Sequence, residues 1–598
     1  MFFLALSRRP LHSPVPSARA YESTIAGFHL TVVTDAWTTR VMREGHGLEL
    51  IESVAPELGH VAGLTLVRVL LDEDLALLQL SRSLVGGHSI YYHLNASGEL
   101  LCSSHIGLLA QAGVVLKENR RTLAELFVYQ YIMPPSTLFE GVAQVPGGAT
   151  IRLKLIDNRW QLAGLLYEDL PSPSRRRRIR DVDELFQRLR GRLEEAIARL
   201  APRRDELAVL LSGGLDSSAL WVLSHRLHGV RRSYSAGFPF EAEDSNFEKE
   251  YALSAAAEFG SKHRYLEPTT STYVRGLVES IAAAEMPVHH LQSVLLFLLF
   301  RDLLPEHEKV VLTGEGAGAL FGLDALVDLF RRERRLFRLR ENRVAFRVLS
   351  SPGVLRCTHS LLTLIKKGWG LQAAFGADSP RNLPLDDPAH ILWSARRFGD
   401  EAWVYRYFDV TPKDVVAGRQ ATLRDFGHHS LYDLWWIYDL IGETAATMSI
   451  WNKLAERNGK ILYSPFLTTE LLALASTAQW PVILDAERPV AKGIARRLGI
   501  SEAIVARPKQ SFSVKPERWA RPRGPFEPFL LLLQKQFGAA EVQTLLVPDH
   551  NRAFTFWTMV NYAIWRSVVI EGESVDRLLP AVGMDSGGET TPPLVNLN

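Results

Sequence analysis

The chain has 598 residues, of which 47% are hydrophobic and 22% are charged, and its formal net charge is only +2. A chain of this length exceeds one ordinary hydrophobic core, so two or more domains are expected. The near-neutral charge gives no global reason to expect nucleic acid or a membrane as a partner, and no uninterrupted apolar run of about 18 residues predicts a transmembrane helix.

The cysteine content points to a reducing compartment. Only Cys102 and Cys357 occur, and they lie far apart in the sequence. They cannot form a disulfide framework or a cysteine-based zinc site, so we expect a cytoplasmic protein. The first residues, MFFLALSRRP, contain a short apolar run with basic residues after it rather than before it, which does not predict a signal peptide.

Residues 1–170 are predicted to be mainly β-strand. Segments such as 64–71, 75–80 and 149–155 are short, rich in branched residues and separated by Gly, Asp or Asn turns. The stretch PSPSRRRR at 171–178 then combines proline and serine with four arginines, a composition that cannot pack a core. It indicates an exposed basic linker.

From Asp181 the hydrophobic period becomes helical. VDELFQRLRGRLEEAIARL has apolar residues three and four positions apart, and an apolar strand, Leu207–Leu211, follows it. A glycine-containing turn and a helix at 219–227 come next, and another strand–loop–helix unit begins at Val310. Strands that alternate with helices predict a parallel sheet that binds ligands at the carboxyl ends of its strands.

The most informative segment is LAVLLSGGLDSSAL, in which a buried strand runs into a glycine-serine turn and then a helix. The two glycines let backbone N–H groups approach an anion without a Cβ in the way. The helix N-terminus adds free donors and a partial positive charge, and Asp216 can hold Mg²⁺ against phosphates. The turn lacks the lysine of a Walker loop. The predicted nucleotide contacts are Leu211, Ser212, Gly213, Gly214, Leu215, Asp216, Ser217 and Ser218.

The string SGGLDSS resembles the phosphate-binding loop of ATP pyrophosphatases, especially asparagine synthetases and their relatives, which cleave ATP between the α- and β-phosphates. The likeness continues at SAGF (235–238), VVLTGEGAGALFG (310–322) and RPKQSFS (507–513). It implies ATP and Mg²⁺ as cofactors, Asp216 as a metal ligand, and Gly237 and Gly314 as further nucleotide contacts.

The N-terminal part also resembles this family, because PPSTLFEGVAQVPG (134–147) is similar to the last portion of its glutaminase domain. The resemblance implies a two-domain α/β fold. The N-terminal domain would be a mainly β, degenerate sandwich of the N-terminal-nucleophile glutaminase type. The C-terminal domain would be a doubly wound parallel sheet of the ATP-pyrophosphatase (HUP-like) type with additional helices. The predicted boundaries are 1–170 (glutaminase-like), 171–180 (linker), 181–584 (synthetase-like) and 585–598 (disordered tail).

Two catalytic residues follow from the resemblance. Glu315 would be the general base or would orient the attacking amine, since a carboxylate near the adenylate can accept the proton that the amine loses. Lys509 would stabilise the negative charge that develops in the transition states. Lys492, by contrast, is expected to be a helix-face lysine.

Two departures from the family matter. Family glutaminases need a cysteine as the first mature residue, but this chain has Phe2 and no cysteine before Cys102, so glutamine is not expected to be the nitrogen source. In GEGAGALFG, Gly318 and Ala319 stand where the family usually has Asp and Glu. Either another residue such as Asp324 holds the ion, or Asp216 and the phosphates suffice, or activity is reduced.

Relatives with a degenerate glutaminase domain include β-lactam synthetases and lasso-peptide cyclases. The lasso-peptide cyclases join an Asp or Glu side chain of a short peptide to the peptide's N-terminal amine. Residues 331–347 carry eight arginines against two glutamates, and could bind a peptide's acidic groups or form a solvated helix. Four aromatics could line a peptide site or belong to the core: Trp435, Trp436, Tyr438 and Trp451.

The sequence therefore suggests an ATP-dependent amide ligase that forms a macrolactam on a ribosomal peptide. Its substrate would be a peptide or small carboxylate, and its partners a leader-peptide-binding protein and a protease. Two alternatives stay open. One is an asparagine synthetase-type or β-lactam synthetase-type enzyme for a small substrate, and the other is a non-catalytic scaffold that binds a peptide or nucleotide.

Overall fold

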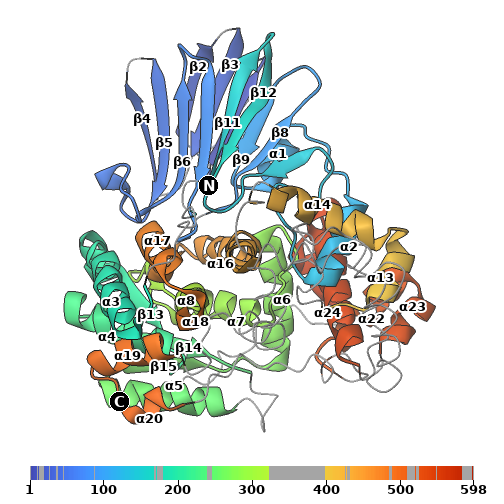
Figure 1. The fold of residues 1–598 in the computed structure, drawn as a ribbon. Coiled ribbons are helices and arrows are strands. Elements are labelled where there is room, and N and C mark those ends of the chain that lie inside the picture. Colours follow the sequence, from blue (N-terminus) through green and yellow to red (C-terminus); the bar gives the residue numbers. More distant parts are fainter. Residues whose placement is uncertain are drawn as a thin grey trace, which may run out of the picture.

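The structure is a computed structural model. It describes residues 2–9, 11, 19–25, 27–34, 38–44, 46–86, 88–167, 170, 179–238, 246–321, 398–424, 426, 431–483, 488–507, 519, 524–546, 549–581 and 595–596. The described chain has a β-rich N-terminal domain that stands on a larger α/β domain (Figure 1). This arrangement confirms the two-domain α/β prediction at the level of its sheets, whereas the domain boundaries stay a prediction.

The N-terminal domain consists of two antiparallel sheets, each with six strands. One sheet has the order β10-β8-β9-β1-β3-β2 and the other β12-β11-β7-β6-β5-β4. Alternate residues of each strand point to opposite faces, so Val67, Val69 and Leu71 of one strand all enter the core between the sheets. The strands are β1 Phe2–Ser7, β2 Arg19–Ile25, β3 Phe28–Thr34, β4 Thr39–Glu44, β5 Gly47–Ser53, β6 Thr65–Asp72, β7 Leu77–Arg82, β8 Tyr91–Leu94, β9 Leu100–Ser103, β10 Val142–Gln144, β11 Ala149–Ile156 and β12 Arg159–Leu166.

The second domain is built on a sheet of order β17-β16-β13-β14-β15-β18, in which the first five strands are parallel. The chain enters at β13, in the middle of the sheet, adds β14 and β15 on one side, and then returns to add β16 and β17 on the other. The order therefore reverses beside β13, which is where open α/β sheets bind their ligands. The strands are β13 Leu207–Leu210, β14 Arg232–Ala236, β15 Lys262–Leu266, β16 Val310–Leu312, β17 Ile461–Tyr463 and β18 Val595–Asn596.

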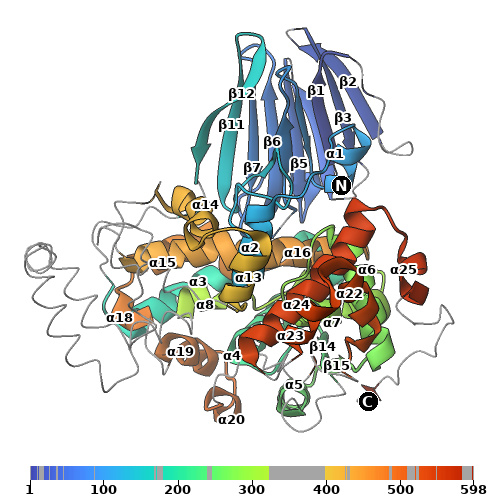
Figure 2. The same ribbon diagram turned by 90° about the vertical axis from the view of Figure 1, so that its right-hand side faces the viewer.

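Helices pack around this sheet, and α3, α4, α17 and α19 form one contiguous group while α6, α7 and α16 form another. Asp181 caps α3 by accepting a hydrogen bond from the backbone of Asp183, so the predicted helical start is confirmed. Further helices flank the second group (Figure 2). The two groups comprise α3 Val182–Ala198, α4 Leu215–His228, α17 Thr469–Thr477, α19 Pro489–Arg497, α6 Thr270–Ala284, α7 Gln292–Leu298 and α16 Ala445–Glu456. The other helices named below are α1 Ile106–Gln111, α2 Arg120–Tyr129, α5 Asn246–Phe259, α8 Ala317–Phe321, α14 Pro412–Arg424, α15 Leu431–Asp439 and α20 Glu502–Val505.

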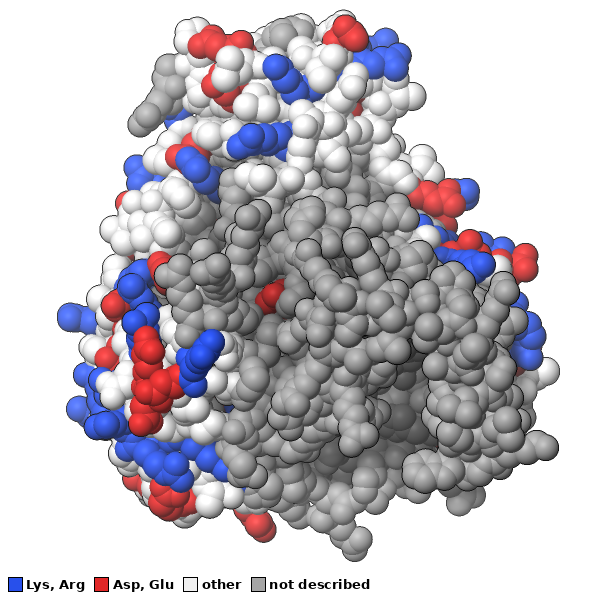
Figure 3. Space-filling view, viewed as in Figure 1, with Lys and Arg blue, Asp and Glu red and all other residues white. Residues whose placement is uncertain are grey.

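The outer flank of the α/β domain carries charges of both signs. In Figure 3, acidic and basic side chains alternate over the side formed by α3, α4, α19 and α20. Several are ion-paired along or between these helices, for example Arg192 with Glu195 at 2.6 Å and Arg496 with Glu502 at 2.5 Å. None of the helices in the described ranges is both long and apolar enough to cross a membrane.

Several predicted segments can be compared with the structure. The four aromatics Trp435, Trp436, Tyr438 and Trp451 are buried, so they belong to the core. Helix α4 begins at Leu215, four residues before the predicted start at Ala219, because its first turn contains the Asp and Ser residues of the phosphate turn. The arginine-rich stretches at 171–178 and 331–347 lie outside the described residues. So does the predicted tail at 585–598, apart from Val595 and Asn596, which pair with β15.

Candidate functional site

Two loops meet at the point where the strand order reverses. One follows β13 and contains the glycine-serine turn, and the other follows β16 and contains the GEGAG segment. A Cβ added to Gly314 would lie 3.5 Å from both the Cβ of Asp216 and the backbone nitrogen of Ser217. The two predicted phosphate-side loops are therefore in contact, although about 100 residues separate them in the chain.

The glycine-serine turn has a conformation that only glycine accommodates at Gly213. Its φ is +76°, and a Cβ there would lie 2.2 Å from the carbonyl oxygen of Tyr251. The guanidinium of Arg507 donates to the carbonyl oxygens of both Gly213 and Tyr251, each at 3.2 Å, and lies over the Tyr251 ring. Arg507, the first residue of the RPKQSFS segment, thus links the turn to helix α5 through these two carbonyl groups.

The serines of the turn divide into two kinds. Ser212 and Ser217 bond to each other, with their hydroxyl oxygens 3.0 Å apart. The hydroxyl of Ser218 is fully buried and has no hydrogen-bond partner within the described residues. Buried hydroxyls are nearly always paired, so this one fits an acceptor supplied by a ligand. Ser218 lies in the first turn of α4, whose first N–H groups have no partner within the helix, and a helix N-terminus of this kind suits a phosphate.

The end of β14 forms the second predicted nucleotide contact. A Cβ on Gly237 would lie 2.0 Å from the hydroxyl oxygen of Tyr265, so a larger residue here would displace the Tyr265 side chain. The backbone N–H of Gly237 donates to the carbonyl of Leu266 on the neighbouring strand at 3.0 Å. Leu211 is buried beneath the turn, and its N–H donates to the carbonyl of Tyr234 at 2.9 Å. The assignment of these residues as nucleotide contacts stays a prediction.

Glu315 lies directly after β16, beside a group of carboxyls that the sequence did not reveal. Its carbonyl accepts a hydrogen bond from Ser464 at 2.5 Å. Burial raises the pKa of Asp439, and the charges of Glu443 and Glu315 raise it further, to about 8. Thr444 donates to the Asp439 carboxyl at 3.0 Å. Asp439 and Glu443 come from the end of α15 and the π-helical turn after it, Leu440–Thr444, so three carboxyls share one electrostatic environment.

The magnesium site is less complete than the family pattern implies. Asp216 is the predicted ligand, but its carboxylate is contacted by Arg488, whose terminal nitrogen lies 2.9 and 3.1 Å from the two oxygens. Gly318, in α8, offers no side-chain ligand, and within the described chain no group of three or more His, Cys, Asp or Glu residues could hold a metal. Magnesium often uses one carboxylate together with substrate phosphates, so Asp216 fits as a single protein ligand once Arg488 releases it.

Two residues of the predicted site cannot be placed. Lys509, the second catalytic candidate, and Asp324, the alternative metal ligand, lie outside the described residues. Lys492 is half-buried on α19, one turn after Arg488, as expected for a helix-face lysine.

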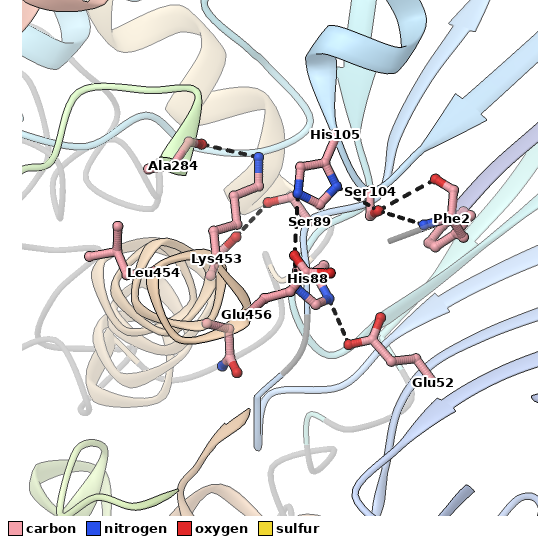
Figure 4. Close-up of polar contacts among 12 residues, drawn as sticks. Phe2, Glu52, His88, Ser89, Ser104, His105, Ala284, Lys453, Leu454 and Glu456 are labelled. Atoms are coloured by element: carbon pink, nitrogen blue, oxygen red, sulfur yellow. Dashed lines mark hydrogen bonds and ion pairs between the residues drawn. The ribbon is translucent and has the colours of Figure 1, made fainter. Parts of the chain in front are cut away.

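Phe2, which the resemblance places where the family has its glutaminase nucleophile, is packed in the core. The side chain of Phe2 is 1% exposed and belongs to the core between the two β-sheets. Its N–H donates to the hydroxyl of Ser104 at 2.9 Å (Figure 4). The hydroxyl of Ser103 donates to the Phe2 carbonyl at 2.8 Å. Cys102, the one cysteine among the described residues, is fully buried in β9, and burial raises the pKa of its thiol above the ordinary value.

Beside Phe2, a charged cluster joins the two domains (Figure 4). His88 lies between two carboxylates, with Glu52 of its own domain at 2.6 Å and Glu456 of α16 at 2.8 Å. His105 reaches the same Glu456 at 3.2 Å. Burial lowers the pKa of His88, but Glu456 and Glu52 outweigh it and raise the pKa to about 9. The cluster is thus an ionised clamp rather than a nucleophilic site.

Comparison with known proteins agrees with this geometry. The sequence pattern of the family described as asparagine synthase matches residues 188–541, more than half of the chain. The chain belongs to the asparagine synthase family. It is 25% identical over 503 residues to a Mycobacterium bovis protein named "Putative asparagine synthetase (glutamine-hydrolyzing)", covering 79% of this chain and 71% of the relative.

The present chain is also similar to an enzyme named for forming a β-lactam ring. It is 30% identical over 189 residues to the carboxyethyl-arginine β-lactam synthase of Streptomyces clavuligerus, a match that covers 30% of this chain and 34% of that enzyme. Asparagine synthetase 1 of Bacillus subtilis is 22% identical over 233 residues, 39% of this chain and 35% of the relative. Homologues in the asparagine synthase family are ATP-dependent ligases.

Proposed function

We propose that the chain is an ATP-dependent carbon–nitrogen ligase that activates a carboxylate as its adenylate and joins it to an amine. The observation that carries this proposal is the seat at the end of β13. There a glycine turn and a helix N-terminus lie where the strand order reverses, and the Ser218 hydroxyl in the first turn of that helix has no partner among the described residues. Such a seat suits the pyrophosphate portion of ATP.

The proposed chemistry has two steps. A substrate carboxylate oxygen attacks the α-phosphorus of ATP, and the bond between this phosphorus and the bridging oxygen breaks to release pyrophosphate. An amine nitrogen then attacks the acyl carbon, and the carbon–oxygen bond to AMP breaks. Magnesium, when bound, offsets negative charge on the phosphates, and Asp216 would hold it.

The amine must lose a proton as it attacks, and the carboxyls beside Glu315 suit this role. A base is most effective when its pKa lies near the working pH. Asp439, whose pKa is about 8, shares an environment with the charges of Glu315 and Glu443, so it becomes a carboxylate that can take up a proton as the pH approaches 8. Lys509, carried over from the family resemblance, would stabilise the negative transition states.

We further propose that the amine belongs to the substrate itself and that the product is a macrolactam. Phe2 occupies a packed core position and cannot supply a nucleophile for glutamine hydrolysis, which supports an amine source other than glutamine. The substrate would be a ribosomal peptide whose Asp or Glu side chain closes onto its N-terminal amine. A leader-peptide-binding protein and a protease would deliver it.

The test offers the purified protein ATP and Mg²⁺ with linear peptides that carry an acidic residue a few positions from the N-terminus. The expected result is AMP release together with a peptide that has lost one water. The Glu315→Gln variant should still exchange pyrophosphate into ATP but should lose most of the cyclic product.

Two other functions predict different outcomes in the same assay. AMP release with free aspartate and ammonia, and with no peptide, would identify a small-molecule synthetase and contradict the macrolactam. A β-lactam synthetase-type enzyme would instead cyclise a small amino acid derivative. A non-catalytic scaffold would exchange no pyrophosphate with any acid, which would contradict the ligase itself.

A further inference from the structure

Arg488 reaches the phosphate turn from a distant part of the chain. It precedes α19 and lies 272 residues from Asp216, yet its terminal nitrogen touches both carboxylate oxygens of that residue. The Arg488 side chain is only 10% exposed. A buried, always-charged guanidinium has therefore been placed at the seat that we assign to pyrophosphate.

The surroundings of Arg488 leave part of its donor capacity unused. Its Nε is buried and has no hydrogen-bond partner within the described ranges. Guanidinium groups carry five N–H donors in a planar fork that matches phosphate oxygens, and a buried donor without an acceptor is unfavourable. An acceptor supplied by a ligand would satisfy it, as it would the buried hydroxyl of Ser218, two residues beyond Asp216.

The charge balance of the two loops points the same way. Where the family usually has a second carboxylate for the metal, this chain has Gly318. Asp216 already lies in the first turn of α4, where the helix dipole favours a negative charge, so it needs no arginine for its own stability. With one carboxylate fewer and one buried arginine in contact, the site is more positive than the family pattern.

We propose that Arg488 is a phosphate-binding residue of this site, with Asp216 as its partner when no nucleotide is bound. This inference rests on the proposed function. When ATP binds, oxygens of its β- or γ-phosphate take the guanidinium donors, and the Asp216 carboxylate is released to a cation. The arginine thereby supplies part of the charge neutralisation that the family obtains from a metal held by two carboxylates.

The test is a double-mutant cycle read out by calorimetric binding of inorganic pyrophosphate, ATP and AMP in the presence of EDTA. Arg488→Gln, Asp216→Asn and the double variant are compared with the natural chain. Arg496→Gln, which removes an exposed arginine from α19, the helix that follows Arg488, is the matched control. Arg488→Lys keeps the charge, and thermal melting of every variant checks that each remains folded.

The Asp216→Asn background separates the two roles that Arg488 could have. If Arg488 contacts phosphate, its loss in this background still weakens pyrophosphate and ATP binding by about 10- to 100-fold, the effect of one charged hydrogen-bonding group. AMP, which lacks the β- and γ-phosphates, should bind equally to both proteins. Arg488→Lys should fall between the natural chain and Arg488→Gln, because a point charge replaces the fork.

Other results would overturn the inference. If Asp216→Asn and the double variant bind pyrophosphate equally, Arg488 only neutralises Asp216. If AMP binding falls as much as ATP binding, Arg488 acts on the fold of the site rather than on phosphate. Failure of the natural chain to bind ATP both in EDTA and in Mg²⁺ would instead remove the proposed function, together with the inference that rests on it.

Discussion

Replacing His88 by glutamine should weaken the clamp between the two domains in a way that depends on pH. His88 is buried between Glu52 and Glu456, which belong to different domains. Glutamine has a similar length but no charge, so the variant leaves two carboxylates facing each other without a cation between them. Such an uncompensated buried charge is strongly destabilising.

The magnitude follows from the pKa of His88, which the fold raises from 6.5 to about 9. A difference of this size corresponds to about 3 kcal/mol of stabilisation from the protonated ring. Because the pKa is raised on folding, the contribution is fully present below about pH 6.5 and is lost as the pH rises through about 9. Above that pH the natural chain also has a neutral group between the two carboxylates.

The assay is urea unfolding of the natural chain and His88→Gln, monitored by tryptophan fluorescence at pH 6 and at pH 10. Distant groups that titrate in this range affect both proteins equally, so the difference between the proteins reports on His88 and the residues paired with it, Glu52, Glu456 and His105. We expect the variant to be less stable by about 3 kcal/mol at pH 6 and by much less at pH 10. An equal difference at the two pH values would refute the ionised clamp and leave His88 as a neutral packing residue.

Three further predictions concern the proposed active site. Gly213→Ala should lose at least about tenfold in ATP affinity by calorimetry, because its Cβ would collide with the Tyr251 carbonyl, whereas Gly191→Ala on an open helix face should bind normally. Asp439→Asn should remove the rise in ligase rate expected as the pH passes through about 8, measured as a pH–rate profile. Glu315→Gln should shift the same rise to lower pH in its residual rate of product formation, since loss of its charge lowers the pKa of Asp439; an unmoved profile would contradict the shared environment.

The parts of the fold and site that could be predicted are those encoded by neighbouring residues. The phosphate turn could be predicted because strand, glycines and helix follow one another within a few positions. The start of α3 could be predicted from Asp181, a residue type that favours the N-cap position. The start of α4 was wrong by four residues because Asp and Ser favour turns and caps as readily as a first helical turn. Domain type was predictable for the same reason, since the period of the pattern changes from two to 3.6 near Asp181.

What could not be predicted depends on contacts between distant segments. Arg488 precedes a proline in an unremarkable stretch, and nothing near it in sequence indicates that it touches Asp216. Asp439 lies within an apolar run that would normally be assigned to the core, and its raised pKa arises from burial and from carboxyls on other elements. Both features require the tertiary fold, in which loops from different strands converge at one edge of the sheet.

These long-range contacts also give the N-terminal domain a structural role. Helix α16 connects the carboxyls beside Glu315 with the charged cluster around His88. The π-helical turn that carries Glu443 precedes this helix, and Glu456 is its last residue. The N-terminal domain holds this helix along its length: Arg82 donates to the Ala445 carbonyl at 2.9 Å, and His88 pairs with Glu456. A shift of the sandwich would therefore move the helix and, with it, the carboxyls beside Glu315. Since catalytic groups must be held within a fraction of 1 Å of their working positions, the sandwich would act as a rigid support for the carboxyls beside Glu315.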